Sequence, residues 1–373
     1  MKTGKSLVEL ATELERRANN KTDYLAKTDL ISMSRDEAEA LEGDFDRLLK
    51  LNVGDIKVGI NGLAHDQLGS YCDIPAAYYD RCRTHDPDLL IHNVNSWIAK
   101  AHETRMVRTL DGKARAFLSN AYRPLENEDL ANAILPILLD GGEYDIHSCD
   151  VTEKRLYIKV VGKSLTRELA KHGATLGSGH TIVHVMFPAI TVSNSEVGCG
   201  ALSIQRGLYD SGCSNLGTYG EKALRRAHVG GRHELVSDEL VSKLSDDTRR
   251  KMDSALWSQV RDVIKLGFAE GEFNALCDKV EGAQADRIEK DADVVKVVKV
   301  AGQKLGLREG EQKGVLQCLI EGGDLSRCGL HNAITKFSQE DALSYDRATE
   351  LERIGAQVIE LPKNDWNVIA RAN

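Results

Sequence analysis

The chain has 373 residues, of which 42% are hydrophobic and 28% charged, with a formal net charge of −8. These values are typical of a soluble globular protein, and no apolar run approaches the ~18 residues that a membrane span needs. The negative charge excludes a protein that coats nucleic acid with its whole surface. The eight cysteines have no repeated spacing and no export signal is visible, so we expect free thiols and a cytoplasmic protein.

The length predicts more than one domain, because single hydrophobic cores stop growing at about 250–300 residues. The order of helical and extended patterns along the chain predicts an α+β class with an antiparallel-sheet core, flanking helices and a mostly helical C-terminal domain. We expect a helical arm over residues 1–50, an α+β core over 51–235 and a helical domain over 236–373.

The first part of the chain alternates between helical and extended patterns. Apolar residues at helical spacing predict a helix over 5–20, and Ser34 is a good N-cap for a second helix over 34–51. A strand is expected to begin at Asp55. Two helices should follow, entered through Pro75 and Pro87, because proline is tolerated in the first turn of a helix.

Two hairpins are predicted in the core. The first turns at Asp111-Gly112, the dipeptide most typical of a two-residue hairpin loop. A helix over 127–140, containing Pro136 and stopped by Gly141-Gly142, and two strands over 143–162 should follow. The second hairpin joins an apolar strand over 179–192 to a strand over 201–210 through the turn SNSEVG, where Ser, Asn and Gly favour turn conformations.

The sequence after the second hairpin predicts helices almost throughout. A basic helix is expected over 218–234, ending near Gly230-Gly231, and a helical domain from Ser237 onward. Residues 358–370 are predicted to add a strand and a last turn.

Several motifs together resemble a family of uncharacterised phage and plasmid-like proteins. The family is a domain of unknown function, so the resemblance implies a setting in phages, prophages and plasmids, and in the cytoplasm of an infected bacterial host, without assigning a catalytic residue. Its genes often lie near genes of DNA processing and recombination. The motifs that carry the resemblance are IPAAYYDRC, RTLDGKARAFLSNAYRPLENEDL, TVSNSEVGCGALSI with SGCSN, RRAHVGGRH, and GLHNAITKF with DRATELERIG.

Positive charge is concentrated in one part of the chain. Residues 151–235 carry eleven basic and six acidic side chains, whereas acidic residues outnumber basic ones on both sides. Phosphate contacts need such donors on one face, so nucleic-acid binding is expected here, with Lys154, Arg155 and Lys159 as additional donors. Pairing of a basic helix with the acidic remainder of the chain would explain the same pattern. The proposed nucleic-acid-binding residues are Arg206, Lys222, Arg225, Arg226, His228, Arg232 and His233.

Enzymatic alternatives rest on fewer features. Cys199, Cys213, His228 and His233 could bind a metal, although no C-x-x-C pair is present and buried thiols with hydrogen-bonded histidines explain them equally. Gly162-Lys163-Ser164 resembles the end of a P-loop but lacks the required preceding glycine. No cofactor is therefore expected.

The serines of the SNSEVG turn and Glu196 are weak catalytic candidates. Ser193 and Ser195 lack the G-x-S-x-G context of a nucleophile elbow, and Glu196 has no evident partner for acid–base chemistry. Turn formation explains these residues. No catalytic residue is assigned.

The sequence therefore favours a phage-encoded, non-catalytic nucleic-acid-binding accessory protein of DNA metabolism or recombination. The order of elements is similar to that of phage single-strand annealing proteins, which form rings, so a homo-oligomer is expected by analogy. The alternatives are a metal-dependent enzyme with a Cys/His site and a self-assembling structural or host-interaction protein that contacts phage or host proteins.

Overall fold

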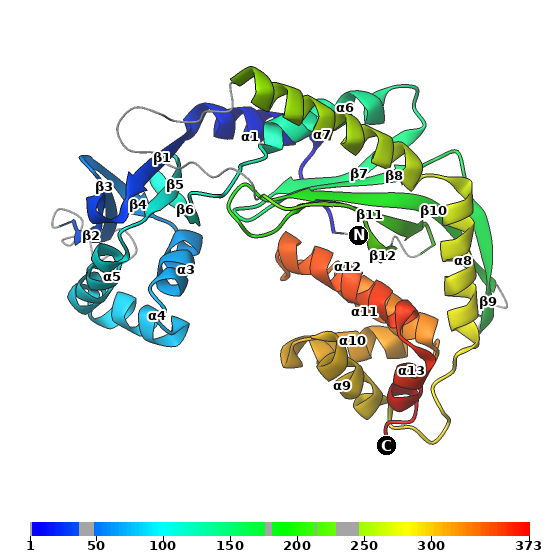
Figure 1. Cartoon of the computed structure of the whole chain (residues 1–373). Coiled ribbons are helices and arrows are strands. Elements are labelled where there is room, and N and C mark those ends of the chain that lie inside the picture. Colours follow the sequence, from blue (N-terminus) through cyan, green and yellow to red (C-terminus); the bar gives the residue numbers. More distant parts are fainter. Residues whose placement is uncertain (1, 37–47, 176–180, 213–214, 229–245) are drawn as a thin grey trace.

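The computed structural model describes residues 2–36, 48–175, 181–212, 215–228 and 246–373. In this part the protein is α+β, with two sheets followed by a helical C-terminal region, as the sequence predicts (Figure 1). None of the described helices combines the length and apolar character that a membrane crossing requires.

The first sheet has the strand order β1-β5-β6-β4-β3-β2. Neighbouring strands are antiparallel except β4 and β6, which pair in parallel. The predicted turn between β5 and β6 is confirmed, since Asp111 and Gly112 both have positive φ, as a type I′ turn requires. The strands are β1 (Lys21–Lys27), β2 (Ile31–Arg35), β3 (Leu49–Val53), β4 (Ile56–Ile60), β5 (Thr104–Leu110) and β6 (Lys113–Ser119).

Three helices pack on the first sheet and share its hydrophobic core, and a short 3-10 turn, η1 (Thr28–Leu30), joins β1 to β2. Two start at side-chain caps, since Asn61 accepts a hydrogen bond from the N–H of Ala64 and Asp86 from that of Leu89. Pro75 and Pro87 stand at helix starts, as predicted. The helices are α3 (Gly62–Tyr71), α4 (Ala76–His85) and α5 (Pro87–Ala101).

The second sheet is antiparallel and has the order β12-β11-β10-β8-β7, with β9 pairing to β10. The predicted hairpin at its centre is confirmed: β10 and β11 pair from Met186–Asp210 to Ser193–Ser203, and residues 195–201 connect them, so the first two residues of SNSEVG still lie in β10. The strands are β7 (Tyr144–Val151), β8 (Leu156–Gly162), β9 (Arg167–Thr175), β10 (Thr181–Asn194), β11 (Leu202–Asp210) and β12 (Asn215–Arg226).

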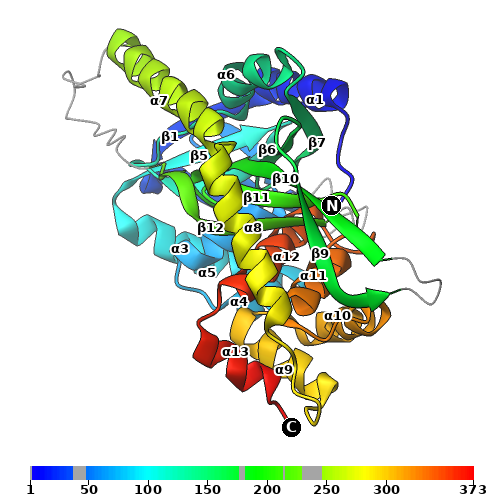
Figure 2. The ribbon, with the colours of Figure 1, turned by 90° about the vertical axis from the view of Figure 1, so that its right-hand side faces the viewer.

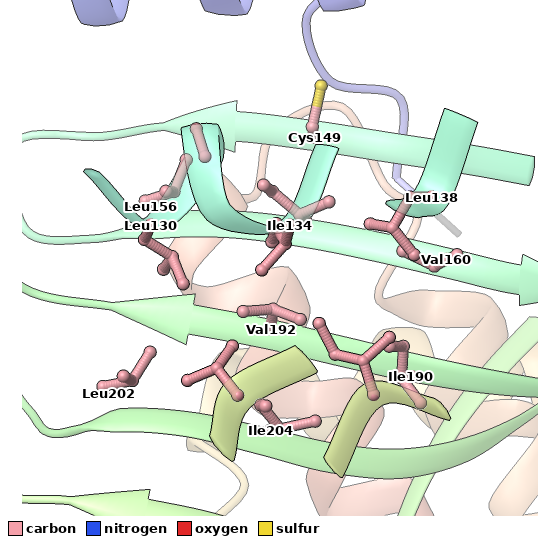
Figure 3. Packing of buried hydrophobic residues seen from close by; sticks show 14 of the residues in the cluster. Leu130, Ile134, Leu138, Cys149, Leu156, Val160, Ile190, Val192, Leu202 and Ile204 are labelled. Carbon is pink, nitrogen blue, oxygen red and sulfur yellow. The ribbon is translucent and has the colours of Figure 1, made fainter. Parts of the chain in front are cut away.

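Helices cover both faces of the second sheet. On one face lie α1 (Leu7–Asn20), α6 (Asn127–Leu139) and α7 (Asp246–Gly267), which bury an apolar core against the strands (Figure 3). In that core Ile134 and Leu138 of α6 contact the face that carries Val192 and Ile204. Figure 2 shows α7 leading into α8 (Glu270–Ala285) along the side of the sheet.

The other face of the second sheet meets the C-terminal helices, of which α12 lies along it (Figure 1). These helices also bury a core of their own, which includes Val297, Leu330 and Trp366. They are α9 (Val294–Leu305), α10 (Glu309–Gly322), α11 (Arg327–Phe337), α12 (Tyr345–Glu360) and α13 (Lys363–Ala370).

Two local predictions are wrong. Ser34 lies in β2, where pairing with β3 holds it extended, so it caps no helix, while residues 37–47 lie outside the described part. Within the described residues of the expected arm, α1 is followed by strands β1, β2 and β3 of the first sheet. Residues 358–370 end α12 and form α13 rather than a strand.

The predicted basic helix over 218–234 is also wrong as far as the structure describes it. Residues up to Arg226 form β12, paired with β11 from Asp210–Asn215 to Leu202–Arg226. The segment EKALRR has helical propensity, but the preceding Gly-Thr-Tyr-Gly favours extended backbone, and pairing along a long neighbouring strand overrides the local preference.

Candidate functional site

The predicted nucleic-acid-binding residues do not share one face. Arg225 and Arg226 are both exposed but adjacent on a strand, so their side chains lie on opposite faces of the sheet. Arg206 forms an ion pair with Glu272 of α8 at 3.0 Å. His228 is buried, stacks on Tyr122 and contacts the carbonyl of Arg123.

The structure describes no side-chain position for the three remaining predicted residues. Lys222 lies on β12, while Arg232 and His233 lie outside the described residues.

The alternative metal ligands cannot be assembled from the described residues. Cys213 and His233 lie outside them, and His228 is engaged as described above. Burial raises the pKa of the Cys199 thiol, which keeps it protonated near neutral pH. Within the described part of the chain, no group of three or more His, Cys, Asp or Glu side chains is placed to hold a metal.

A polar surface instead lies on the α12 side of the second sheet. Because side chains alternate along a strand, the residues between the apolar core positions point to this side. The strand register aligns them in rows: Ser193 stands between Tyr157 and Ser203, and Thr191 between Lys159 and Gln205.

Between this surface and the C-terminal helices is a cavity of about 650 Å³. It lies within the ~300–1,000 Å³ range of pockets that bury small ligands. Five basic and two acidic side chains take part in its lining. The lining residues are Lys154, Arg155, Tyr157, Thr191, Ser193, Cys199, Ser203, Gln205, Thr218, Arg308, Ser344, Asp346, Arg347, Thr349, Glu350 and Arg353.

The exposed basic side chains around the cavity form what we call the rim: Lys154, Arg308 and Arg353. Lys154 is exposed. The side chain of Arg308 is 73% exposed and lies 4.0 Å from Glu311, its acidic neighbour. The 42%-exposed side chain of Arg353 approaches Glu350 at 3.9 Å. Exposed pairs at such distances are weak, so the rim cations can turn to an anionic ligand at little cost.

Two other arginines at the cavity are held in place. Arg347 is buried and forms ion pairs with Glu311 and Glu350, both at 2.6 Å; the bond to Glu311 raises its pKa. Arg155 donates to the carbonyl oxygen of Cys199. These two groups therefore shape the wall of the cavity while the rim supplies the adjustable charge.

The buried hydroxyl groups of the sheet form what we call the floor: Thr191, Ser193, Ser203 and Thr218. Ser193 and Ser203 bond to each other at 2.9 Å. The Oγ1 atoms of Thr191 and Thr218 have no hydrogen-bond partner among the described residues, although these residues are only 3% and 4% exposed. An unpartnered buried hydroxyl is costly, so polar atoms left in this state point to a ligand.

An ion pair lies buried beside the floor. Lys159 of β8 contacts Glu352 of α12 at 2.7 Å, and both side chains are at most 1% exposed. Burial lowers the pKa of Lys159, and Glu352 opposes that shift. The lysine that the sequence suggested as a phosphate donor therefore joins α12 to the sheet.

The SNSEVG turn joins the two sheets. Glu196 is buried and accepts hydrogen bonds from Arg115 of β6 at 2.8 Å and from the N–H of Asn127 at 2.7 Å. Arg108 of β5 donates to the carbonyl of Glu196 at 2.7 Å. The carboxylate of Glu196 therefore has a structural role, and the turn, which sequence reasoning treated as an isolated hairpin loop, is a contact between the two sheets.

Hydrogen bonds to Ser195 also hold this turn in place. Ser195 accepts hydrogen bonds at Oγ from the N–H groups of Val197 and Cys199, as a turn-forming serine does. Its carbonyl accepts from Tyr122. Because Arg155 holds Cys199 from the cavity side, the turn links the contact between the sheets to the cavity wall.

A smaller cavity of about 20 Å³ lies between the second sheet, α8 and α11. His184 contacts Asp210 there, and His331 contacts the hydroxyl of Tyr219 at 3.0 Å. Its volume is that of a single water molecule, so it leaves no room for a substrate.

No family model, no curated protein and no solved structure matches this chain. The candidate site therefore rests on its own geometry.

Sequence reasoning found part of this site. It named Lys154, Arg155 and Arg225. Arg225 pairs with Ser203 in the strand register, so it continues the row of residues that forms the floor. Sequence reasoning missed Arg308 and Arg353, which come from helices that are distant in sequence. Alternating polar residues in β10 and β11 were a signal for the floor, but the same alternation is typical of any solvent-facing sheet.

Proposed function

We propose that the protein is a non-catalytic accessory factor of DNA metabolism that binds nucleic acid at the cavity between the second sheet and α12. The observation that carries the proposal is the combination of an exposed basic rim with a buried hydroxyl floor. Cations near the surface attract the phosphates of a strand, whereas hydroxyls can donate to or accept from sugars and bases. The resemblance to proteins of phages and plasmids is consistent with this role.

Positive charge continues beyond the residues that line the cavity. Arg225 extends the row that contains Ser203, on the cavity side of the sheet, while Arg226 stands opposite Leu202 and so lies on the face of the apolar core. A nucleic-acid strand that leaves the cavity along this row would therefore meet Arg225. The protein as a whole is acidic, so binding should be confined to this region and be sensitive to salt.

The test is the affinity of a fluorescent oligonucleotide, measured by anisotropy at low salt. Replacing two rim residues, Lys154→Glu with Arg353→Glu, should weaken binding at least about tenfold and make the logarithmic salt dependence shallower by about 1.4, since each phosphate contact contributes ~0.7. The control, Arg371→Glu with Lys336→Glu, alters two exposed, ion-paired cations away from the cavity and should change affinity little. Equal affinity of the rim variant and the unaltered protein would refute the proposal.

A second, closely matched comparison uses neighbouring residues on β12. Arg225→Glu should weaken binding, whereas Arg226→Glu should not, because the two side chains lie on opposite faces of the sheet. Equal losses in both variants would indicate a surface centred on the strand edge instead of the cavity.

A further inference from the structure

The depth of the floor determines which part of a nucleic-acid strand could reach it. Thr191 on the central strand β10 and Thr218 on the edge strand β12 are almost completely buried, yet their hydroxyls line the cavity without partners among the described residues. A phosphate backbone lying across the exposed rim would not contact them. Only a group that projects from the phosphate backbone could contact these two hydroxyls.

The chemistry of the floor fits a nucleoside. Hydroxyl groups both donate and accept hydrogen bonds, which suits the sugar and the base edges, whereas they cannot neutralise a phosphate. Gln205 and Tyr157 add amide and phenol groups to the same lining. The Tyr157 hydroxyl bonds to Asp346 at 2.8 Å, which fixes its ring at the edge of the floor.

We infer that the cavity receives one unpaired nucleotide, with its phosphate at the rim and its sugar and base against the hydroxyl floor. This inference rests on the proposed function and narrows the ligand to a single strand. In a duplex each base is stacked and paired, and reaching a concave pocket would require extruding it, which costs several kcal/mol. A single strand meets no such cost.

The experiment measures binding of deoxyadenosine 5′-monophosphate by calorimetry and its competition with a labelled single-stranded oligonucleotide. The nucleotide should bind and compete, while inorganic phosphate should compete at least about tenfold less well. A duplex of the same sequence should bind more weakly than the single strand.

The test variant is Thr191→Val with Thr218→Val, which removes both hydroxyls while keeping the side-chain shape. Nucleotide affinity should fall about tenfold, while the unfolding temperature should stay the same or rise, because the lost hydroxyls have no partners to lose. The control Thr109→Val removes a buried hydroxyl of β5 that bonds to the carbonyl of Thr22, and should lower stability without changing affinity.

The outcomes separate the two proposals. Unchanged nucleotide affinity in the double threonine variant, or phosphate competing as well as the nucleotide, would overturn the inference even if oligonucleotides bind. Nucleotide binding that depends on the two threonines, without binding of any oligonucleotide, would support the pocket and overturn the proposed function.

Discussion

The two faces of the second sheet are built from the same strands but differ in the contacts that they make with the helices covering them. One face carries Val192 and Ile204 and is covered by α1, α6 and α7 in a continuous apolar core. The other carries Thr191 and Ser203 and meets α12 across a polar cavity and a buried ion pair, with a smaller apolar cluster that includes Leu208 and Ile359 beside them. Apolar burial is non-directional and supplies stability, whereas buried polar groups stabilise only when they are paired. The first face therefore supports the fold, and the second is suited to binding.

The largest effect should come from breaking the ion pair that fastens α12 to the polar face. Glu352→Leu leaves the ammonium group of Lys159 buried without its partner and should lower the free energy of unfolding by about 3–5 kcal/mol. The double variant Lys159→Met with Glu352→Leu should recover most of this loss. Denaturant unfolding measures both, and a single variant within about 1 kcal/mol of the unaltered protein would contradict the role of the pair.

A smaller difference should separate single truncations on the two faces. Ile134→Ala opens a cavity in the apolar core and should cost about 2–5 kcal/mol, because Ile134 is fully buried there. Ser203→Ala on the polar face removes one hydrogen bond and should cost no more than about 1.5 kcal/mol. Equal costs, measured by denaturant unfolding, would mean that the two faces do not divide stability as described.

The smallest effect concerns pH, at the far end of the polar face. Burial lowers the pKa of His331, so the folded protein favours its neutral form, although Asp210 opposes the shift. Stability should therefore fall as the pH drops below about 6.5, by at most ~1.4 kcal/mol per pH unit from this group. His331→Gln should make the loss between pH 7 and 5 shallower.

Other buried histidines contribute to the same pH dependence. Burial lowers the pKa of His65 to about 3, so His65 stays neutral over this range and part of the loss should persist in the His331 variant. An identical slope in the His331 variant, determined by unfolding at each pH, would show that this residue is protonated equally in both states.

Local sequence was sufficient for elements whose signals lie within a few residues. The Asp111-Gly112 turn, the proline-led starts of α4 and α5 and the hairpin of β10 and β11 depend on backbone preferences of their own residues. The α+β class followed from the same patterns. None of these features needed knowledge of a distant segment.

Tertiary structure alone decided the features that depend on distant partners. Pairing with β11 made a strand of the segment that ends at Arg226, which separated the faces of Arg225 and Arg226. Contact with Arg115 turned Glu196 from an isolated carboxylate into part of the contact between the two sheets. The cavity exists because α12 packs on a sheet about 150 residues earlier in the chain, and such long-range contacts leave no periodicity or motif in the local sequence.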